Sequence, residues 1–104
     1  MTPVELAERL AGPMPPRLLD VRQPEEFAIA ALPGARLVPL GELLERIEEL
    51  ADWQGHEVVV ICHHGIRSAR AIGWLRSGGF ARLHNLMGGM DRWSLEVNPE
   101  VPRY

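Results

Sequence analysis

The most reactive side chain in this sequence is that of Cys62, the only cysteine among its 104 residues. It ends a run of β-branched residues, 58–61, and a glycine, an arginine and a serine that open a helical pattern follow within six positions. A buried strand that delivers a thiol to the start of a helix places the sulfur where backbone N–H groups and the helix dipole favour negative charge. Both favour the thiolate, the reactive form. We therefore expect a nucleophile here, although a free cysteine is more often a core residue.

The residues after Cys62 form the expected substrate-binding loop. The segment 62–67 can turn its N–H groups into a concave anion site, with Gly65 supplying the backbone freedom. Arg67 stands in the first helical turn, where a cation opposes the helix dipole unless an anion is bound there, so we expect it to bind an anionic substrate group. The other members of this loop are His63, His64, Ile66 and Ser68. We expect the two histidines to shape the site rather than act as acid or base.

A metal site is a weaker interpretation of the same loop. His63, His64, His84 and Cys62 are suitable ligand types for a metal ion. Adjacent histidines in a tight loop rarely converge on one ion, so the sequence predicts no metal. We expect no other cofactor.

Composition and charge limit the class of protein. Hydrophobic residues make up 46% and charged residues 24%, and the length predicts one domain over residues 1–104. The net charge of −3 argues against a nucleic-acid partner. The sequence contains neither an apolar run of membrane-spanning length nor a signal-peptide pattern at its start, so we expect no membrane association and a cytoplasmic location.

The pattern of apolar segments predicts an α/β fold. Strands are expected at 17–22, 36–40, 57–61 and 80–86, and helices at 2–10, from 23, at 42–51, at 68–77 and after 89. Alternation of this kind predicts a parallel sheet with helices on both faces. Sites in such sheets form at the carboxyl ends of strands, where both Cys62 and Asp20 are expected. Asp20 and Arg22 are expected to pair with each other or with neighbouring loops and so to support the fold.

Three separated segments together resemble the rhodanese family. They are Leu19-Asp20-Val21-Arg22-Gln23-Pro24-Glu25-Glu26-Phe27 with the later Leu32-Pro33-Gly34-Ala35, then Val60-Ile61-Cys62-His63-His64-Gly65-Ile66-Arg67-Ser68, and finally Leu86-Met87-Gly88-Gly89-Met90-Asp91-Arg92-Trp93. The resemblance implies a single-domain rhodanese fold around a parallel five-stranded sheet. It also implies a thiosulfate sulfurtransferase, in which Cys62 attacks the outer sulfur of thiosulfate, releases sulfite and passes the sulfur to cyanide or another thiophilic acceptor. One departure is visible: Ala30 and Ala31 stand where the family commonly has glycine and histidine.

Two other functions stay open at this point. The domain could be a persulfide carrier that delivers sulfur to a protein partner in cofactor or tRNA thiolation. Cysteine phosphatases and arsenate reductases also use a cysteine, a loop of N–H groups and an arginine, but their arginine comes six positions after the cysteine. Here Arg67 comes five positions after Cys62, and the shorter loop suits one extra sulfur atom better than a phosphoryl group.

Overall fold

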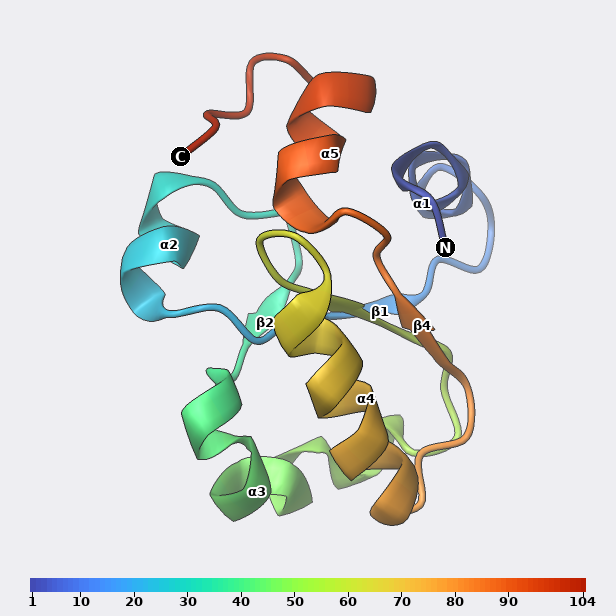
Figure 1. Ribbon diagram of the computed structural model, residues 1–104. Coiled ribbons are helices and arrows are strands. Elements are labelled where there is room, and N and C mark those ends of the chain that lie inside the picture. The colour runs from blue at the N-terminus through green and yellow to red at the C-terminus, as the bar shows by residue number, and fades with distance from the viewer.

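A four-stranded parallel sheet is the centre of the structure, a computed structural model that describes all 104 residues. The strands are β1 (Arg17–Asp20), β2 (Arg36–Leu37), β3 (Val58–Ile61) and β4 (Leu83–Asn85), arranged in the order β2-β1-β3-β4 (Figure 1). The central strand β3 is buried along its whole length, as its uninterrupted β-branched residues predict. The predicted α/β class and parallel sheet are therefore confirmed.

The expectation of five strands is wrong. The structure contains the four strands that the apolar segments predict, and the fifth came only from the resemblance. Met1 does bond to the free edge of β4, because its N–H donates to Asn85 O and its carbonyl accepts from Met87 N, both at 2.9 Å. This pairing cannot extend, since Thr2 already caps the next helix and Pro3 has no N–H to donate.

Helices cover both faces of the sheet and bury two separate apolar clusters. On one face, α1 (Pro3–Leu10) and α5 (Gly89–Glu96) contribute Leu6, Met90 and Trp93. On the other face, α3 (Leu43–Arg46) and α4 (Ile66–Ser77) contribute Leu43, Ala71, Ile72 and Leu75. The sheet is thereby held rigid between two layers, and the carboxyl ends of β1 and β3 lie at one edge of this sandwich.

The helix predicted over 42–51 is not continuous. A 3-10 turn, η1 (Leu40–Glu42), precedes α3, and a second 3-10 segment, η2 (Ile47–Trp53), follows it. Side chains three residues apart eclipse in a 3-10 helix, so Ile47, Leu50 and Trp53 all face the same core cluster. Leu44, although apolar, is 60% exposed.

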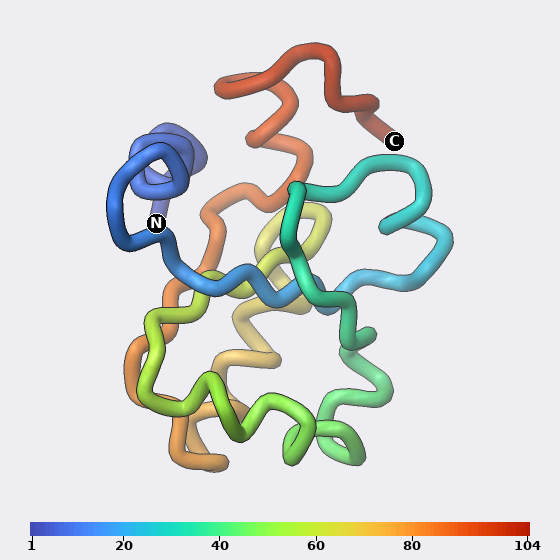
Figure 2. The backbone as a smooth tube through the Cα atoms, turned by 180° about the vertical axis from the view of Figure 1, so that it is seen from behind, coloured from blue at the N-terminus to red at the C-terminus, as the bar shows by residue number.

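The remaining features of the fold are α2, the start of α4 and the segment that follows α5. Helix α2 (Pro24–Ile29) follows β1, and α4 begins at Ile66, two residues before the predicted start. The segment after α5 returns toward α2, and the views from the front and from behind both show its end beside that helix (Figures 1 and 2). None of the helices combines the length and the apolar character needed to cross a bilayer.

Candidate functional site

Cys62 lies directly after β3, at the carboxyl end of the most deeply buried strand. Its Sγ accepts a hydrogen bond of 3.0 Å from the N–H of Gly65, the residue that caps α4. Gly65 has a φ of 103°, a conformation that glycine adopts without strain, so the turn that brings this N–H back to the sulfur depends on it. The sulfur is thus held at the start of a helix by a backbone donor. The cysteine itself is only 1% exposed.

A ring of hydrogen bonds fixes the inner side of the sulfur. Ser68 Oγ lies 3.2 Å from Cys62 Sγ and donates to Asn85 Oδ1 at 2.5 Å. The amide nitrogen of Asn85 in turn donates to Gly65 O at 3.0 Å, which fixes the orientation of the side chain. Sequence reasoning missed Asn85. The available signal was its position at the end of the fourth predicted strand, because parallel strands bring their carboxyl ends to one edge.

Gly89 allows α5 to approach the Cys62 loop closely. A Cβ at this position would lie 2.4 Å from the carbonyl oxygens of both Cys62 and His63. Those carbonyls accept hydrogen bonds from Met90 N at 2.9 Å and Asp91 N at 3.1 Å. The first turn of α5 therefore anchors the backbone of the loop, and only glycine permits the contact.

The guanidinium of Arg67 is paired with Glu26 of α2. The two N–H···O distances are 2.6 and 2.8 Å, a bidentate geometry, and the Arg67 side chain is 33% exposed. Arg67 lowers the pKa of Glu26 to about 2, so this carboxylate is ionised at neutral pH. Glu26 also accepts a hydrogen bond of 2.9 Å from the hydroxyl of Tyr104. Arg67, the residue predicted to bind a substrate anion, is therefore already paired with the Glu26 carboxylate in this structure.

Asp20 and Arg22 form an ion pair that is completely buried beside the site. Arg22 Nε and Nη2 donate to the Asp20 carboxylate at 2.7 to 3.1 Å, and Arg22 Nη2 also donates to Ala30 O at 2.6 Å. Burial by itself would lower the pKa of Arg22, but its hydrogen bonds to Asp20 and Tyr104 outweigh this and raise it. The bond to residue 30 uses its backbone carbonyl. It therefore does not depend on the side chain at this position, where this chain has alanine and the resembled family commonly has glycine.

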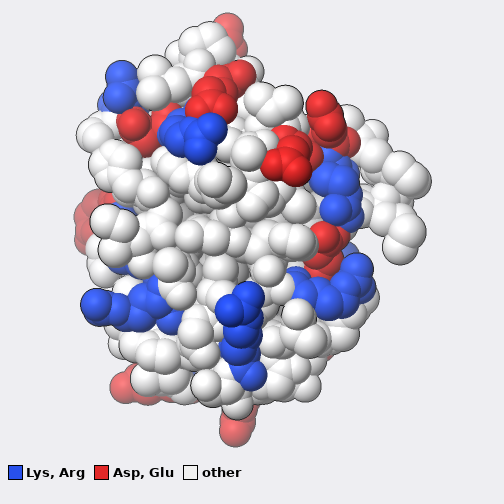
Figure 3. All heavy atoms as spheres, turned by 45° about the vertical axis from the view of Figure 1, so that its right-hand side comes forward, with Lys and Arg blue, Asp and Glu red and all other residues white.

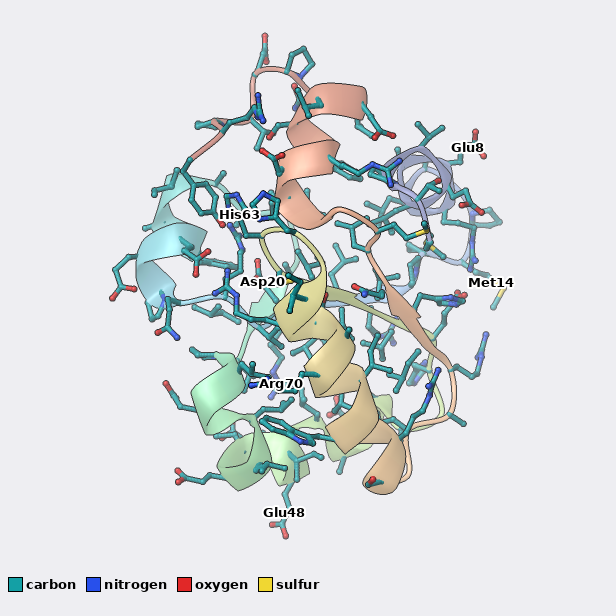
Figure 4. The ribbon with its side chains drawn as sticks, in the orientation of Figure 1. Glu8, Met14, Asp20, Glu48, His63 and Arg70 are labelled. Atoms are coloured by element: carbon teal, nitrogen blue, oxygen red, sulfur yellow. The ribbon has the colours of Figure 1, made fainter.

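The two histidines extend outward from the loop. The ring of His63 packs edge-to-face on Tyr104 with centroids 4.1 Å apart, and in Figure 4 His63 lies near the turn between β3 and α4. Burial and the neighbouring His64 lower the pKa of His63, so the ring is neutral at pH 7. Ile66, although part of the expected substrate loop, is 79% exposed.

The histidines do not group with His84 and Cys62, the ligand set considered from the sequence. Potential ligand atoms of His63, His64 and Asp91 instead lie within 4.8 Å of one another. Asp91 is already paired with Arg103 at 2.9 Å, and this positive charge opposes a cation at the same place.

The site is closed over the sulfur in this structure. The two surface hollows of the molecule lie at the amino ends of β1 and β3, around Pro15 and Arg17, and neither includes Cys62. On the face shown in Figure 3, arginines and carboxylates alternate and form no continuous basic patch. The structure brings Cys62, Gly65 and Ser68 together, whereas Arg67 belongs to an outer rim with Glu26 and Tyr104. Sequence reasoning missed the part that Tyr104 takes in this rim, because no local pattern relates it to Glu26, which lies 78 positions away.

Two proteins with similar sequences have names that refer to sulfur transfer or sulfur carriage. The chain is 35% identical over 101 residues to the adenylyltransferase and sulfurtransferase MOCS3 of Arabidopsis thaliana, covering 84% of this chain and 22% of that protein. It is 39% identical over 77 residues to the putative sulfur carrier protein YrkF of Bacillus subtilis, covering 74% of this chain and 40% of that protein. The chain thus spans less than half the length of either relative.

A solved structure and a family model agree with these relatives. The human single-domain sulfurtransferase TSTD1 superposes with a TM-score of 0.79 at 30% identity, over 92% of this chain and 95% of that one. The sequence model of the rhodanese-like domain matches residues 2–96. By sequence and by structure, this chain belongs to the rhodanese-like domain family.

Proposed function

We propose that this protein is a sulfurtransferase that moves a sulfane sulfur from thiosulfate, or from a related persulfide donor, to cyanide or another thiophilic acceptor. The observation that carries the proposal is the 3.0 Å hydrogen bond from Gly65 N–H to Cys62 Sγ at the start of α4. A backbone donor at a helix start stabilises sulfur as an anion, which is the form that attacks. The family's relatives that are named as sulfurtransferases support the same chemistry.

The reaction consists of two displacements at sulfur. The Cys62 thiolate attacks the outer sulfur of thiosulfate, a new S–S bond forms, and the S–S bond of thiosulfate breaks so that sulfite leaves with its electron pair. Cyanide then attacks the outer sulfur of the Cys62 persulfide, thiocyanate leaves, and the thiolate returns. Covalent storage of this kind replaces one difficult transfer by two easier ones. Charge is conserved in each displacement, and neither needs an external oxidant or reductant.

The loop offers donors for the second sulfur. The first N–H groups of an α-helix have no acceptor within the helix, and in α4 these belong to Ile66, Arg67 and Ser68. We propose that they surround the position that an outer sulfur on Cys62 would take, and so support a persulfide anion as well as a thiolate. Arg67 is proposed to bind the sulfonate group of the donor, either alongside Glu26 or in its place.

The test is the mass of the protein after incubation with thiosulfate. The proposal predicts a gain of one sulfur atom that disappears when cyanide is added, with thiocyanate appearing in solution. Cys62→Ser should show no gain and lose sulfur transfer entirely. Wild-type protein that stays unmodified under thiosulfate and under a low-molecular-weight persulfide would contradict the proposal. A phosphorylated chromogenic substrate serves as the control for phosphatase activity, and we expect no turnover of it.

A second candidate is a persulfide carrier that hands its sulfur to a protein acceptor. It is favoured by YrkF, whose name is that of a putative sulfur carrier, and by MOCS3, in which the matching sequence is part of a longer protein. Radiolabelled sulfur loaded on Cys62 distinguishes the two functions. A carrier should transfer the label to an acceptor protein faster than to cyanide, whereas an enzyme of small molecules should do the reverse.

A further inference from the structure

Tyr104 is bound to the rim of the Cys62 loop on three sides. Its ring packs on His63 with centroids 4.1 Å apart and an interplanar angle of 81°. Its hydroxyl accepts from Arg22 Nη1 at 2.8 Å and donates to Glu26 Oε2 at 2.9 Å. The partners come from the loop, from just after β1 and from α2, so one side chain ties three separate parts of the site together.

Cys62 has almost no access from solvent in this structure. The cysteine is 1% exposed, and no surface hollow reaches it. Tyr104 itself is 41% exposed, so its ring stands between solvent and the rim rather than within the core. Tyr104 contacts His63, which follows Cys62 in the loop, and Glu26, which is paired with the expected donor ligand Arg67.

The charged partners of Tyr104 are fixed in different ways. Arg22 is fully buried and fastened to Asp20 and Ala30, so it does not depend on Tyr104 for its position. Glu26 and Arg67 are partly exposed, and a donor anion can compete for the guanidinium. The part of the rim that can yield to a donor is therefore the side formed by Arg67, Glu26 and the Tyr104 side chain bonded to Glu26.

We propose that Tyr104 is a specificity-determining residue that selects sulfur donors by size, with its ring as the outer wall of the path to Cys62. The proposal rests on sulfur transfer at Cys62. Thiosulfate and glutathione persulfide are suitable probes because both are anionic and both give up their outer sulfur to the thiolate. Their leaving groups, sulfite and the glutathione thiolate, differ greatly in size. Thiosulfate needs only a narrow opening beside the Tyr104 ring. Glutathione persulfide, a tripeptide, can reach Cys62 only when this ring moves away from His63.

The cost of moving the ring should appear in the kinetics of the large donor. When only an open fraction of the protein can bind a ligand, the apparent affinity falls by that fraction. Opening breaks one aromatic contact and two hydrogen bonds, which predicts a factor of roughly ten or more. Tyr104→Ala removes this cost. It should raise kcat/KM for glutathione persulfide by roughly tenfold and change that for thiosulfate by less than about threefold.

Tyr104→Phe is the matched control, because it keeps the ring and loses only the two hydrogen bonds of the hydroxyl. It lowers the cost of opening but keeps the ring that has to move, so it should raise kcat/KM for glutathione persulfide by clearly less than Tyr104→Ala does. A Phe variant as permissive as the Ala variant would overturn selection by the ring. A Tyr104→Ala variant that loses activity equally with both donors would show that Tyr104 has only a structural role. A Tyr104→Ala variant with the same ratio of kcat/KM for the two donors as wild type would also overturn the proposal.

Alkylation of Cys62 separates this proposal from the proposed function. Cys62 is the only cysteine, so labelling reports on this site alone. Tyr104→Ala should accelerate labelling by a bulky fluorescein maleimide more than labelling by iodoacetamide. Equal acceleration, or none, would overturn the size barrier whether or not sulfur is transferred. A selective acceleration in a protein that never forms a persulfide would retain the barrier and refute the sulfurtransferase.

Discussion

The two sides of the Cys62 loop are held by different kinds of interaction. On the inner side, Ser68, Asn85 and the backbone at Gly89 form short, uncharged contacts that are largely buried. On the outer side, Arg67, Glu26 and Tyr104 form a charged network that is partly exposed to solvent. Buried hydrogen bonds are costly to break because the groups find no replacement, whereas partly exposed ion pairs can exchange with water or with a ligand. The inner side thus fixes the sulfur of Cys62, and the contacts of the outer side can exchange with water or with a bound anion.

The largest expected effect tests the inner side. Gly89→Ala places a methyl group against the carbonyls of Cys62 and His63 at a φ of 60°. Strain and the clash together should lower the free energy of unfolding by about 2–5 kcal/mol and abolish persulfide formation in the fraction that folds. Chemical denaturation measures the first effect, and mass spectrometry measures the second.

Gly73→Ala is the control for that substitution. Gly73 lies inside α4, is exposed, and an added Cβ would meet no atom within 4 Å. Alanine should therefore stabilise the protein by about 0.5–1 kcal/mol through helix propensity. If Gly89→Ala proved as harmless as Gly73→Ala, the rigid inner anchor would not exist.

A smaller effect is expected when the cation of the outer side is removed. Arg67→Ala should raise the KM for thiosulfate by roughly tenfold, because a charge-assisted hydrogen bond contributes about 1.5–3 kcal/mol. The loss should fall more on KM than on kcat, since Cys62 and its inner contacts are unchanged. Arg70→Ala, one turn further along the exposed face of α4, is the matched control and should behave as wild type. Equal KM values in the two variants would contradict the anion-binding role of Arg67.

The smallest effect concerns pH and stability. The pKa of Glu26 is lowered from 4.5 to about 2 by Arg67, so the pair stabilises the folded state fully above pH 4.5, and this contribution disappears as the pH falls toward 2. Because a third of the Arg67 side chain is exposed, solvent screening reduces the effect, and Glu26→Gln should cost only about 1 kcal/mol at pH 7. Urea unfolding of both proteins across this range should give curves that converge at low pH. A difference in the free energy of unfolding that stays constant across this pH range would show that the charge of Glu26 does not stabilise the folded state.

Sequence reasoning predicted the fold class and the position of Cys62 between a strand and a helix because both depend on local patterns. The β-branched run before Cys62 specifies a buried strand, and Gly65 specifies the turn that follows it. Element boundaries were predicted less accurately: 3-10 segments interrupt the helix over 42–51, because the spacing of its buried side chains suits both kinds of helix. The five-stranded sheet was wrong because it was carried over from a resemblance and had no segment of this chain to form the additional strand.

The sequence by itself determined that one thiol would stand between a buried strand and a helix start, because strand and helix patterns are set by neighbouring residues. Only the tertiary structure decided what surrounds that thiol. Asn85 reaches Ser68 from the adjacent strand, Gly89 brings α5 against the loop, and Tyr104 meets Glu26 from 78 residues away. Such contacts depend on how the layers pack, and side chains distant along the chain carry no local signal of the partner they will find.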